Sequence, residues 1–191
     1  MRLKDKVIIV TGGGVGIGRA YATGLAKEGA KVVVADIQAE EARKVADDIQ
    51  RAGGEASAVP VDVTSVEKTR AMADTALQKY GRIDVLVNNA ALYSAIKKKP
   101  FAEISGAEWD QVMAVNLKGL FLCVQAVYPA MKKQARGKII NISSGTALGG
   151  TPFFLHYVTS KAGVISFTRE LARELGPDNI CVNAITPGLT I

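Results

Sequence analysis

Short apolar runs recur along the chain, and amphipathic segments separate them. Residues 7–10, Val-Ile-Ile-Val, form a continuous β-branched run that is typical of a strand buried on both faces. Five further apolar runs are predicted to be strands, at residues 31–35, 56–61, 83–87, 138–142 and 180–185. Because buried strands alternate with helices, the pattern indicates an α/β fold with a parallel sheet.

The segments between these strands have the spacing of amphipathic helices. The predicted helices cover residues 19–28, 39–52, 64–80, 109–134 and 153–175. Thr64 and Glu67, and likewise Ser105 and Glu108, are spaced as in a capping box, which marks the start of a helix. Residues 93–101 and 145–152 are expected to be loops.

A glycine-rich turn follows the first strand directly. Gly12, Gly14, Gly16 and Gly18 lie between this strand and the first helix. Glycines let the backbone turn tightly and approach a pyrophosphate without intervening Cβ atoms. The free N–H groups and positive dipole end of the following helix attract phosphates. A glycine turn alone is a weak signal, so its interpretation depends on the neighbouring strands.

Asp36 ends the second strand and favours NAD over NADP. A carboxylate at this position can accept hydrogen bonds from the adenosine ribose hydroxyls, and it repels a 2′-phosphate. Neither Ile37 nor the glycines offer an arginine to hold that phosphate. The alternative is that Asp36 only caps the next helix.

Two polar groups follow later strands. Asp62 comes after the third strand, where it could reach the adenine amino group, or could serve as an ordinary turn or cap residue. Asn88 and Asn89 follow the fourth strand, and such amides can steady a loop beside a cofactor by bonding to backbone groups.

Tyr157 and Lys161 are four residues apart in a predicted helix and therefore share one face. A nearby ammonium favours the phenolate, which would make the tyrosine a usable base. The alternative is a packed aromatic ring beside a solvated charge, because such pairs are ordinary helix neighbours.

Ser143 and Ser144 stand at the carboxyl end of the fifth strand, where ligands gather in open α/β sheets. Asn116 lies among apolar residues and, if buried, must bond a backbone group or a water.

Composition and charge exclude several function classes. The chain has 191 residues, 48% of them hydrophobic and 6% aromatic, with a net charge of +6. No aromatic-basic pattern supports nucleic-acid binding, and with a single histidine, His156, a His/Cys metal site is not expected. Cys123 and Cys181 lie in apolar stretches and are expected to be buried, reduced thiols. No signal peptide and no transmembrane stretch is expected, so the predicted location is cytoplasmic.

Lys97, Lys98 and Lys99 form a basic run in a predicted loop. Such runs are usually solvated surface. A sharper hypothesis is that they attract an anionic substrate.

Together these motifs resemble the short-chain dehydrogenase/reductase family. The resemblance covers essentially the whole chain and is carried by the joint order and spacing of the glycine turn, Asp36, Asp62, residues 88–90, Asn116, Ser144, Tyr157, Lys161, Pro187 and Gly188. It implies a Rossmann-like, doubly wound parallel sheet of strand order 3-2-1-4-5-6, followed in the family by a seventh strand. That seventh strand is missing from this chain, so residues 1–191 are expected to be a single NAD(P)-binding domain that is incomplete at its C-terminus relative to the family.

The resemblance also implies the site residues and their roles. The catalytic group is Asn116, Ser144, Tyr157 and Lys161. The cofactor-binding residues are Gly12, Gly14, Gly16, Ile17, Gly18, Asp36, Ile37, Asp62, Val63, Asn89, Ala90, Tyr157, Lys161, Pro187 and Gly188. Tyr157 transfers the proton of a secondary alcohol or ketone, Lys161 lowers its pKa and holds ribose hydroxyls, Ser144 orients the substrate oxygen, and Asn116 positions a relay water.

Several points stay open in this interpretation. Ala91 stands where the family usually has glycine. An NAD-binding sensor or scaffold without catalysis is the alternative function, and a hydrolase using Ser144 and His156 is disfavoured because no G-x-S-x-G elbow is present. The partners expected are a small alcohol or ketone, held in an apolar pocket near Leu148 and residues 153–155, and a second copy in a homodimer or homotetramer formed by the helices at 109–134 and 153–175.

Overall fold

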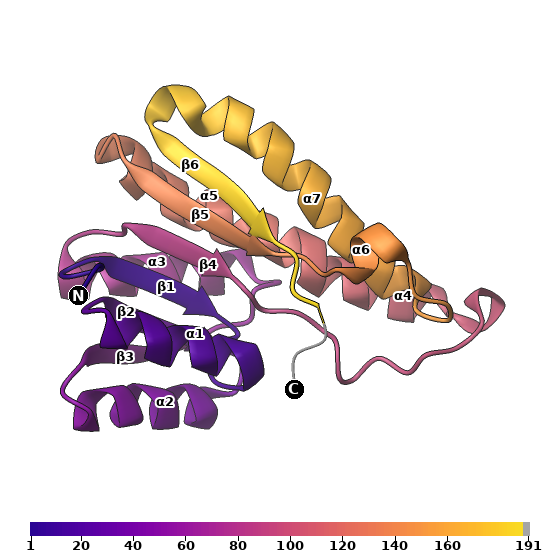
Figure 1. The fold of residues 1–191 in the computed structure, drawn as a ribbon, viewed down its shortest axis with the longest axis horizontal. Coiled ribbons are helices and arrows are strands. Elements are labelled where there is room, and N and C mark those ends of the chain that lie inside the picture. Colours follow the sequence, from indigo (N-terminus) through magenta and orange to yellow (C-terminus); the bar gives the residue numbers. More distant parts are fainter. Residues whose placement is uncertain (189–191) are drawn as a thin grey trace.

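Six parallel strands form one sheet in the computed structural model of the chain, which describes residues 1–188 (Figure 1). Their order is β3-β2-β1-β4-β5-β6, which confirms the predicted doubly wound order. The strands are β1 (Val7–Thr11), β2 (Lys31–Asp36), β3 (Glu55–Pro60), β4 (Val85–Asn88), β5 (Gly137–Ile142) and β6 (Ile180–Ile185). The order reverses between β1 and β4, so the crevice at their carboxyl ends is the position where such sheets bind ligands.

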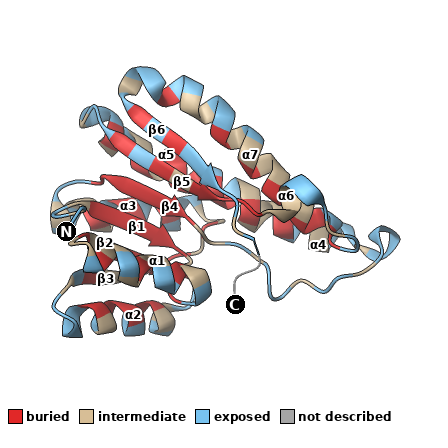
Figure 2. Ribbon diagram, viewed as in Figure 1, coloured by how far each residue is buried: buried red, intermediate tan, exposed pale blue. Residues whose placement is uncertain are grey.

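Helices cover both faces of the sheet. The helices are α1 (Gly16–Lys27), α2 (Ala39–Arg51), α3 (Val66–Tyr80), α4 (Gly106–Met113), α5 (Gly119–Lys133), α6 (Thr146–Gly149) and α7 (Leu155–Leu175), with 3₁₀ turns η1 (Phe101–Glu103) and η3 (Gly176–Asp178) and a π-helical turn η2 (Ala114–Lys118). Helices α1 and α2 pack on one face, against Ile8, Val10, Val32 and Val34. Helices α3, α5 and α7 pack on the other, against neighbours such as Ile9 and Val33. Alternate strand residues therefore reach opposite cores, and the central strands are buried along their length (Figure 2).

Two of the predicted helix boundaries are wrong for a physical reason. The first helix begins at Gly16 and not at residue 19, because the glycine turn itself winds into helix. The third helix has Ser65 as its N-cap, whose side chain accepts from the Lys68 amide, while Thr64 is held by Asp62. The Thr64–Glu67 capping box is therefore not formed. The second capping box, Ser105 with Glu108, is confirmed.

The long helix predicted for residues 109–134 is not a uniform α-helix. It begins at Gly106 and contains the turn η2, in which the Gly119 amide donates to the Ala114 carbonyl five residues earlier. The segment predicted as a loop at 145–152 contains the short helix α6, and the helix predicted from residue 153 begins at Leu155. Phe153 has a φ of 65°, a left-handed conformation that cannot continue a helix.

The prediction that no stretch approaches a membrane span is wrong for one helix, if only its length and composition are considered. The continuous helix Gly106–Lys133 has 28 residues and is apolar enough to cross a membrane. This is weak evidence, because core helices pass the same test, and α5 packs against α3 and the sheet.

Cys123 is buried as expected, but Cys181 is exposed. It lies on β6, at the edge of the sheet, where Asn183 and Ile185 are exposed on the same face. The prediction of two buried thiols is therefore wrong for Cys181.

Candidate functional site

The predicted site residues gather at the carboxyl edge of the sheet. The glycine turn follows β1, Asp36 ends β2, Asn89 follows β4, Ser144 follows β5 and Pro187 follows β6. In parallel strands these ends lie on one side of the sheet, which Figure 1 shows as the edge toward which the arrows point. Segments far apart in sequence therefore contribute to one crevice.

The glycine turn requires glycine at particular positions. Gly12 and Gly16 have φ of 61° and 52°, the left-handed region that side chains rarely adopt. A Cβ on Gly18 would lie 1.9 Å from the Gly12 carbonyl oxygen, so α1 and the turn touch through backbone alone. The result is a strand-to-helix turn whose backbone is open to a ligand at the start of α1.

Two residues of the neighbouring strand ends hold this turn. Asn89 donates from Nδ2 to the carbonyl oxygens of Thr11 and Gly12, at 3.1 and 3.0 Å. Thr11 Oγ1 in turn accepts from the backbone amides of Asn89 and Ala90, each at 3.1 Å. The expectation that the asparagine steadies the loop is met at Asn89. This role of Thr11 was not predicted, although a threonine between a buried strand and a glycine turn could have indicated it.

Asp36 is buried and faces the glycine turn. Its Oδ2 accepts from the Gly14 amide at 2.9 Å, and its Oδ1 accepts from the Gln38 amide at 2.9 Å. A Cβ on Gly14 would lie 3.0 Å from Asp36 Oδ2, so glycine is needed for this approach. The carboxylate bonds the amide of Gln38, the residue before α2, and stands beside the glycine turn, while its ribose role stays a prediction.

Asp62 stabilises the turn after β3, which was the alternative to its predicted contact with adenine. Its Oδ1 accepts from the backbone amide and the hydroxyl of Thr64, at 2.9 and 2.7 Å. Its side chain is only partly buried, so the adenine role stays a prediction. Val63 is buried against Gly119, where a Cβ would meet its Cγ2 at 2.7 Å.

The two serines after β5 point in different directions, as expected of adjacent extended residues. Ser143 donates from Oγ to the Lys161 carbonyl at 2.7 Å and so fixes the start of α7 to the sheet. Ser144 Oγ accepts from the Thr146 hydroxyl at 2.9 Å and lies near enough to Tyr157 to lower the pKa of its phenol. Of the two, Ser144 is the one beside the tyrosine.

Tyr157 and Lys161 lie on one face of α7, at the sheet edge. Both are almost fully buried, at 6% and 3% exposure. Lys161 Nζ donates to the Ile142 carbonyl at 2.8 Å and lies 5.9 Å from the Tyr157 ring centroid. The alternative of a solvated lysine is therefore wrong.

The pKa of Tyr157 moves in the direction opposite to that expected. Burial raises the pKa of its phenol above 10.0, the Tyr93 phenol raises it further, and the Ser144 hydrogen bond only partly opposes this. Lys161 does not lower the pKa of the Tyr157 phenol, because burial lowers the pKa of the lysine's own ammonium to about 8. The chain alone therefore favours a neutral phenol, which is an acid rather than a base.

Asn116 lies in the turn η2 and joins three segments. Its Oδ1 accepts from the Leu92 amide at 2.7 Å, and its Nδ2 donates to the Leu92 carbonyl and to Ser160 Oγ, at 3.2 and 3.1 Å. Ser160 then donates to the Tyr157 carbonyl at 2.7 Å. The expectation that a buried Asn116 must bond backbone groups is confirmed.

The segment after β6 closes the site on the other side. The Gly145 amide donates to the Pro187 carbonyl at 2.9 Å, so Pro187 and Gly188 lie beside the residue that follows Ser144.

An aromatic cluster surrounds Tyr157. Phe154 stacks on it with ring centroids 4.6 Å apart, and Tyr93 lies 5.2 Å from Tyr157 and 5.9 Å from Phe154. Phe154 was expected near an apolar pocket. Tyr93 was missed, because nothing in its loop sequence indicates that the loop folds back onto α7.

His156 points away from the reacting groups. Its side chain is 2% exposed, lies edge-on to Phe154, and has an Nδ1 atom without a partner in the described residues. Burial lowers the pKa of its imidazole. No hydrogen bond joins it to Ser144 within residues 1–188, so a Ser144–His156 hydrolase pair is not formed.

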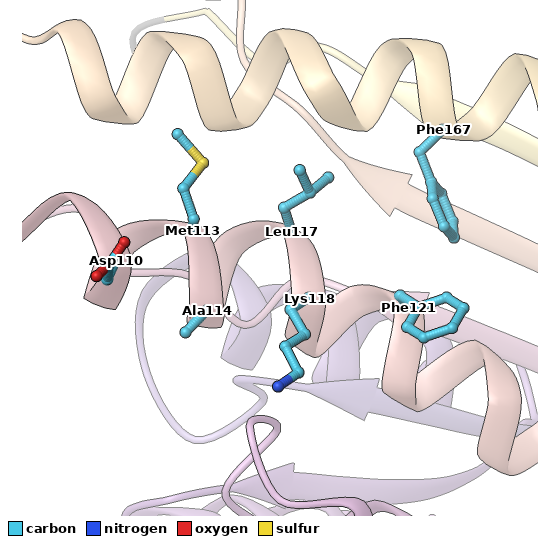
Figure 3. Close-up of a pocket in the computed structure, with 7 residues that line it drawn as sticks. All are labelled: Asp110, Met113, Ala114, Leu117, Lys118, Phe121 and Phe167. Atoms are coloured by element: carbon cyan, nitrogen blue, oxygen red, sulfur yellow. The ribbon is translucent and has the colours of Figure 1, made fainter.

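One hollow is lined by other residues than this site. It measures about 490 Å³ and lies between the helix that runs from α4 to α5 and helix α7. Figure 3 shows Met113 and Leu117 pointing toward α7, and Phe121 and Phe167 facing each other. We call this the interhelical groove.

The crevice residues fit an NAD molecule. The backbone of the glycine turn has no side chains between it and a pyrophosphate, and Val15 beside it is exposed. The carboxylate of Asp36 lies at the turn, where it can accept hydrogen bonds from ribose hydroxyls, and Ile37 next to it is exposed and uncharged.

Comparison with known proteins matches this geometry. The profile of the family described as short chain dehydrogenase matches residues 6–191. A probable galactose dehydrogenase, GalD, of Rhizobium meliloti (strain 1021) is 42% identical over 190 residues, which are 99% of this chain and 73% of that protein.

Two solved structures superpose closely on this chain. The structure of NAD⁺-bound xylitol dehydrogenase has a TM-score of 0.94 at 35% identity, covering 98% of this chain and 72% of that one. A 7α-hydroxysteroid dehydrogenase in complex with NADH and 7-oxo glycochenodeoxycholic acid has a TM-score of 0.92 at 40% identity, with 98% and 72% covered.

Proposed function

The chain belongs to the short-chain dehydrogenase family of oxidoreductases, and we propose that it interconverts a secondary alcohol and a ketone with NAD. The observation that carries the proposal is the buried Tyr157, beside Ser144 and one turn from Lys161, at the same sheet edge as the glycine turn. Proteins similar to this chain act, by their names, on sugars, polyols and steroids, so the reaction class is supported more firmly than any one substrate.

We propose that Tyr157 carries the proton at the substrate oxygen. In reduction the neutral phenol donates its proton to the oxygen, which agrees with its raised pKa. In oxidation the phenolate accepts the hydroxyl proton. Ser144 donates a hydrogen bond to the same oxygen and stabilises the charge that develops there. Bound NAD supplies the hydride acceptor, and the protein supplies geometry and electrostatics.

Lys161 is proposed to hold the ribose beside the nicotinamide. Within residues 1–188 its buried ammonium donates to one acceptor, the Ile142 carbonyl, and burial lowers its pKa to about 8, which disfavours the charged form. Ribose hydroxyls would supply further acceptors and raise that pKa. The ammonium then contributes the positive charge that favours the phenolate of Tyr157.

Asn116 is proposed to act through its backbone in the proton relay. Its side chain is engaged with Leu92 and Ser160. The backbone at Asn116 is wound as a π-turn rather than an α-helix. The Asn116 carbonyl is proposed to hold the water that passes the proton to solvent.

NAD is proposed as the cofactor, with NADP disfavoured by Asp36. The two similar solved structures contain NAD⁺ and NADH, which supports NAD. The buried carboxylate of Asp36 would face a 2′-phosphate, and it forms no ion pair with a cation among residues 1–188.

The interhelical groove is proposed to bind a second copy of this chain, giving a homodimer or a homotetramer. Phe121 is exposed in it, and the groove carries Asp110 and Lys118 on one helix (Figure 3). A two-fold axis across the groove would place Asp110 of one copy near Lys118 of the other. A single species of monomer mass in sedimentation would contradict this.

The test of the proposed activity is NADH formation from a panel of secondary alcohols that includes galactose, xylitol and a 7α-hydroxysteroid. Tyr157→Phe is expected to bind NAD as the natural chain does and to lose turnover, because the proton carrier is gone. Tyr128→Phe removes a phenol that bonds Asp178, far along the chain from the site, and is the matched control. Full turnover by Tyr157→Phe would refute the role of Tyr157.

A further inference from the structure

The three lysines of the loop after β4 differ in their contacts. Lys99 Nζ lies 2.5 Å from Glu108 Oε1, and the Lys99 amide donates to the Phe153 carbonyl at 2.9 Å. The pKa of Glu108 is lowered to about 2, mainly by this lysine, so the pair is fully ionised near neutral pH. Lys97 and Lys98 are exposed and form no ion pair within residues 1–188. The positive charge of Lys99 is therefore compensated, and those of its two neighbours are not.

Lys98 alone of the three lies over the aromatic cluster. Its Nζ is 5.7 Å from the Phe154 ring centroid, and Phe154 stacks on Tyr157 at 4.6 Å. The separation between Lys98 Nζ and the Tyr157 ring centroid is at most the sum of these distances, about 10 Å. The bond from Lys99 to Phe153 keeps this loop on the segment that begins α7.

The surroundings of the cation suit a particular ligand chemistry. Tyr93 is 56% exposed and packs against both Phe154 and Tyr157, so it offers an exposed aromatic surface beside the reacting phenol. The uncompensated ammonium of Lys98, over Phe154 of the same cluster, attracts an anion, and a carboxylate gains a charge-assisted hydrogen bond from it.

We propose that the substrate is a secondary alcohol or ketone that carries a carboxylate, and that Lys98 binds this carboxylate while the carbinol lies at Tyr157. The inference rests on the proposed function and names the substrate class of the same site. Lys98 is then a specificity-determining residue, and Lys97 is solvated surface.

The test compares a charged probe and a neutral one, 4-(1-hydroxyethyl)benzoate and its methyl ester, with NAD as co-substrate. The natural chain is expected to show a higher kcat/KM for the acid. Lys98→Gln is expected to lower the ratio of acid to ester by about two- to fivefold, the range of an exposed ion pair. Lys97→Gln, the matched control, is expected to leave the ratio unchanged, and Lys98→Glu to lower it further.

Failure of this inference and failure of the proposed function give different results. Turnover of both probes with equal kcat/KM in the natural chain, or equal ratios in the Lys98→Gln and Lys97→Gln proteins, overturns the inference and leaves the function standing. If neither probe is turned over, binding of each to the protein with NAD is measured by saturation-transfer NMR. Tighter binding of the acid that Lys98→Gln removes supports the carboxylate site without the reaction, and equal binding overturns it.

Discussion

The pKa of the Tyr157 phenol is set by burial rather than by the nearby cation Lys161. Its ring is packed by Phe154 and Tyr93, and desolvation raises the pKa of its phenol above 10.0. The chain therefore presents a proton donor near neutral pH, and oxidation of an alcohol requires the minor, ionised form.

This predicts a pH dependence for the oxidation direction. Because the phenol must lose its proton before it can accept another, kcat/KM for alcohol oxidation at saturating NAD is expected to rise as the pH increases above neutral. The rate of ketone reduction should not rise over the same range. Initial rates in both directions across a pH series check this. A pH-independent oxidation rate would remove Tyr157 from the proton step.

Asp36 is predicted to set the cofactor preference. Asp36→Asn keeps a side-chain oxygen for one of the two backbone amides that bond the carboxylate, and it removes the negative charge. NADP should bind more tightly and NAD about tenfold more weakly, because a charged hydrogen-bond acceptor is lost. Titration calorimetry with both cofactors measures this. Glu40→Gln, an exposed carboxylate on α2, is the control. Unchanged NADP binding in Asp36→Asn would contradict the assignment.

At the scale of the elements, the glycine turn can be tested with two glycines of one helix. Gly18→Ala places a Cβ 1.9 Å from the Gly12 carbonyl oxygen, whereas a Cβ on Gly24 meets nothing within 4 Å. Gly18→Ala is expected to lower the free energy of unfolding by about 1–3 kcal/mol and to weaken NAD binding, because the turn must move. Gly24→Ala should raise the free energy of unfolding by up to about 1 kcal/mol. Urea unfolding and NAD titration of both proteins check this, and equal effects would contradict it.

The elements that the sequence predicts well are those whose signals are local. The glycine turn and the capping box at Ser105 depend on runs and spacings within a few residues, and the structure has them. The strand order, which the structure also has, was implied by the resemblance to a family. The resemblance to a family supplied the assignment of Ser144 over Ser143, and the structure brings Ser144 to Tyr157.

The features that the sequence did not predict depend on contacts between distant segments. The turn η2 forms where Asn116 bonds Leu92 and Ser160, and neither partner is visible in the helical spacing. Thr64 has the right spacing for a cap, but Asp62 takes its hydroxyl. Cys181 is exposed because α7 covers only the face of β6 that carries Ile180 and Val182, and a strand's periodicity does not show which of its faces is covered.

At the scale of the whole molecule, the single histidine couples stability to pH. The pKa of His156 is lowered by burial, so the folded state favours the neutral imidazole, and the unfolded state titrates near 6.5. The stability that this contributes is present above 6.5 and is lost as the pH falls through the folded-state pKa. The free energy of unfolding is therefore expected to decrease as the pH drops below 6.5, before most carboxylates titrate.

A histidine-free variant checks that coupling. His156→Gln cannot titrate, so its free energy of unfolding should change less over this pH range than that of the natural chain. Unfolding in urea at a series of pH values provides the measurement. Identical pH profiles for the two proteins would show that His156 is not the group responsible.

The central claim is that hydride passes between a secondary alcohol and NAD at Tyr157. The most direct measurement uses an alcohol from the panel with deuterium at its carbinol carbon, and determines by mass spectrometry whether the NADH formed carries the label. The account predicts labelled NADH and a ketone from the natural chain, and neither from Tyr157→Phe. Product with unlabelled NADH, or equal labelling by Tyr157→Phe, would contradict the account.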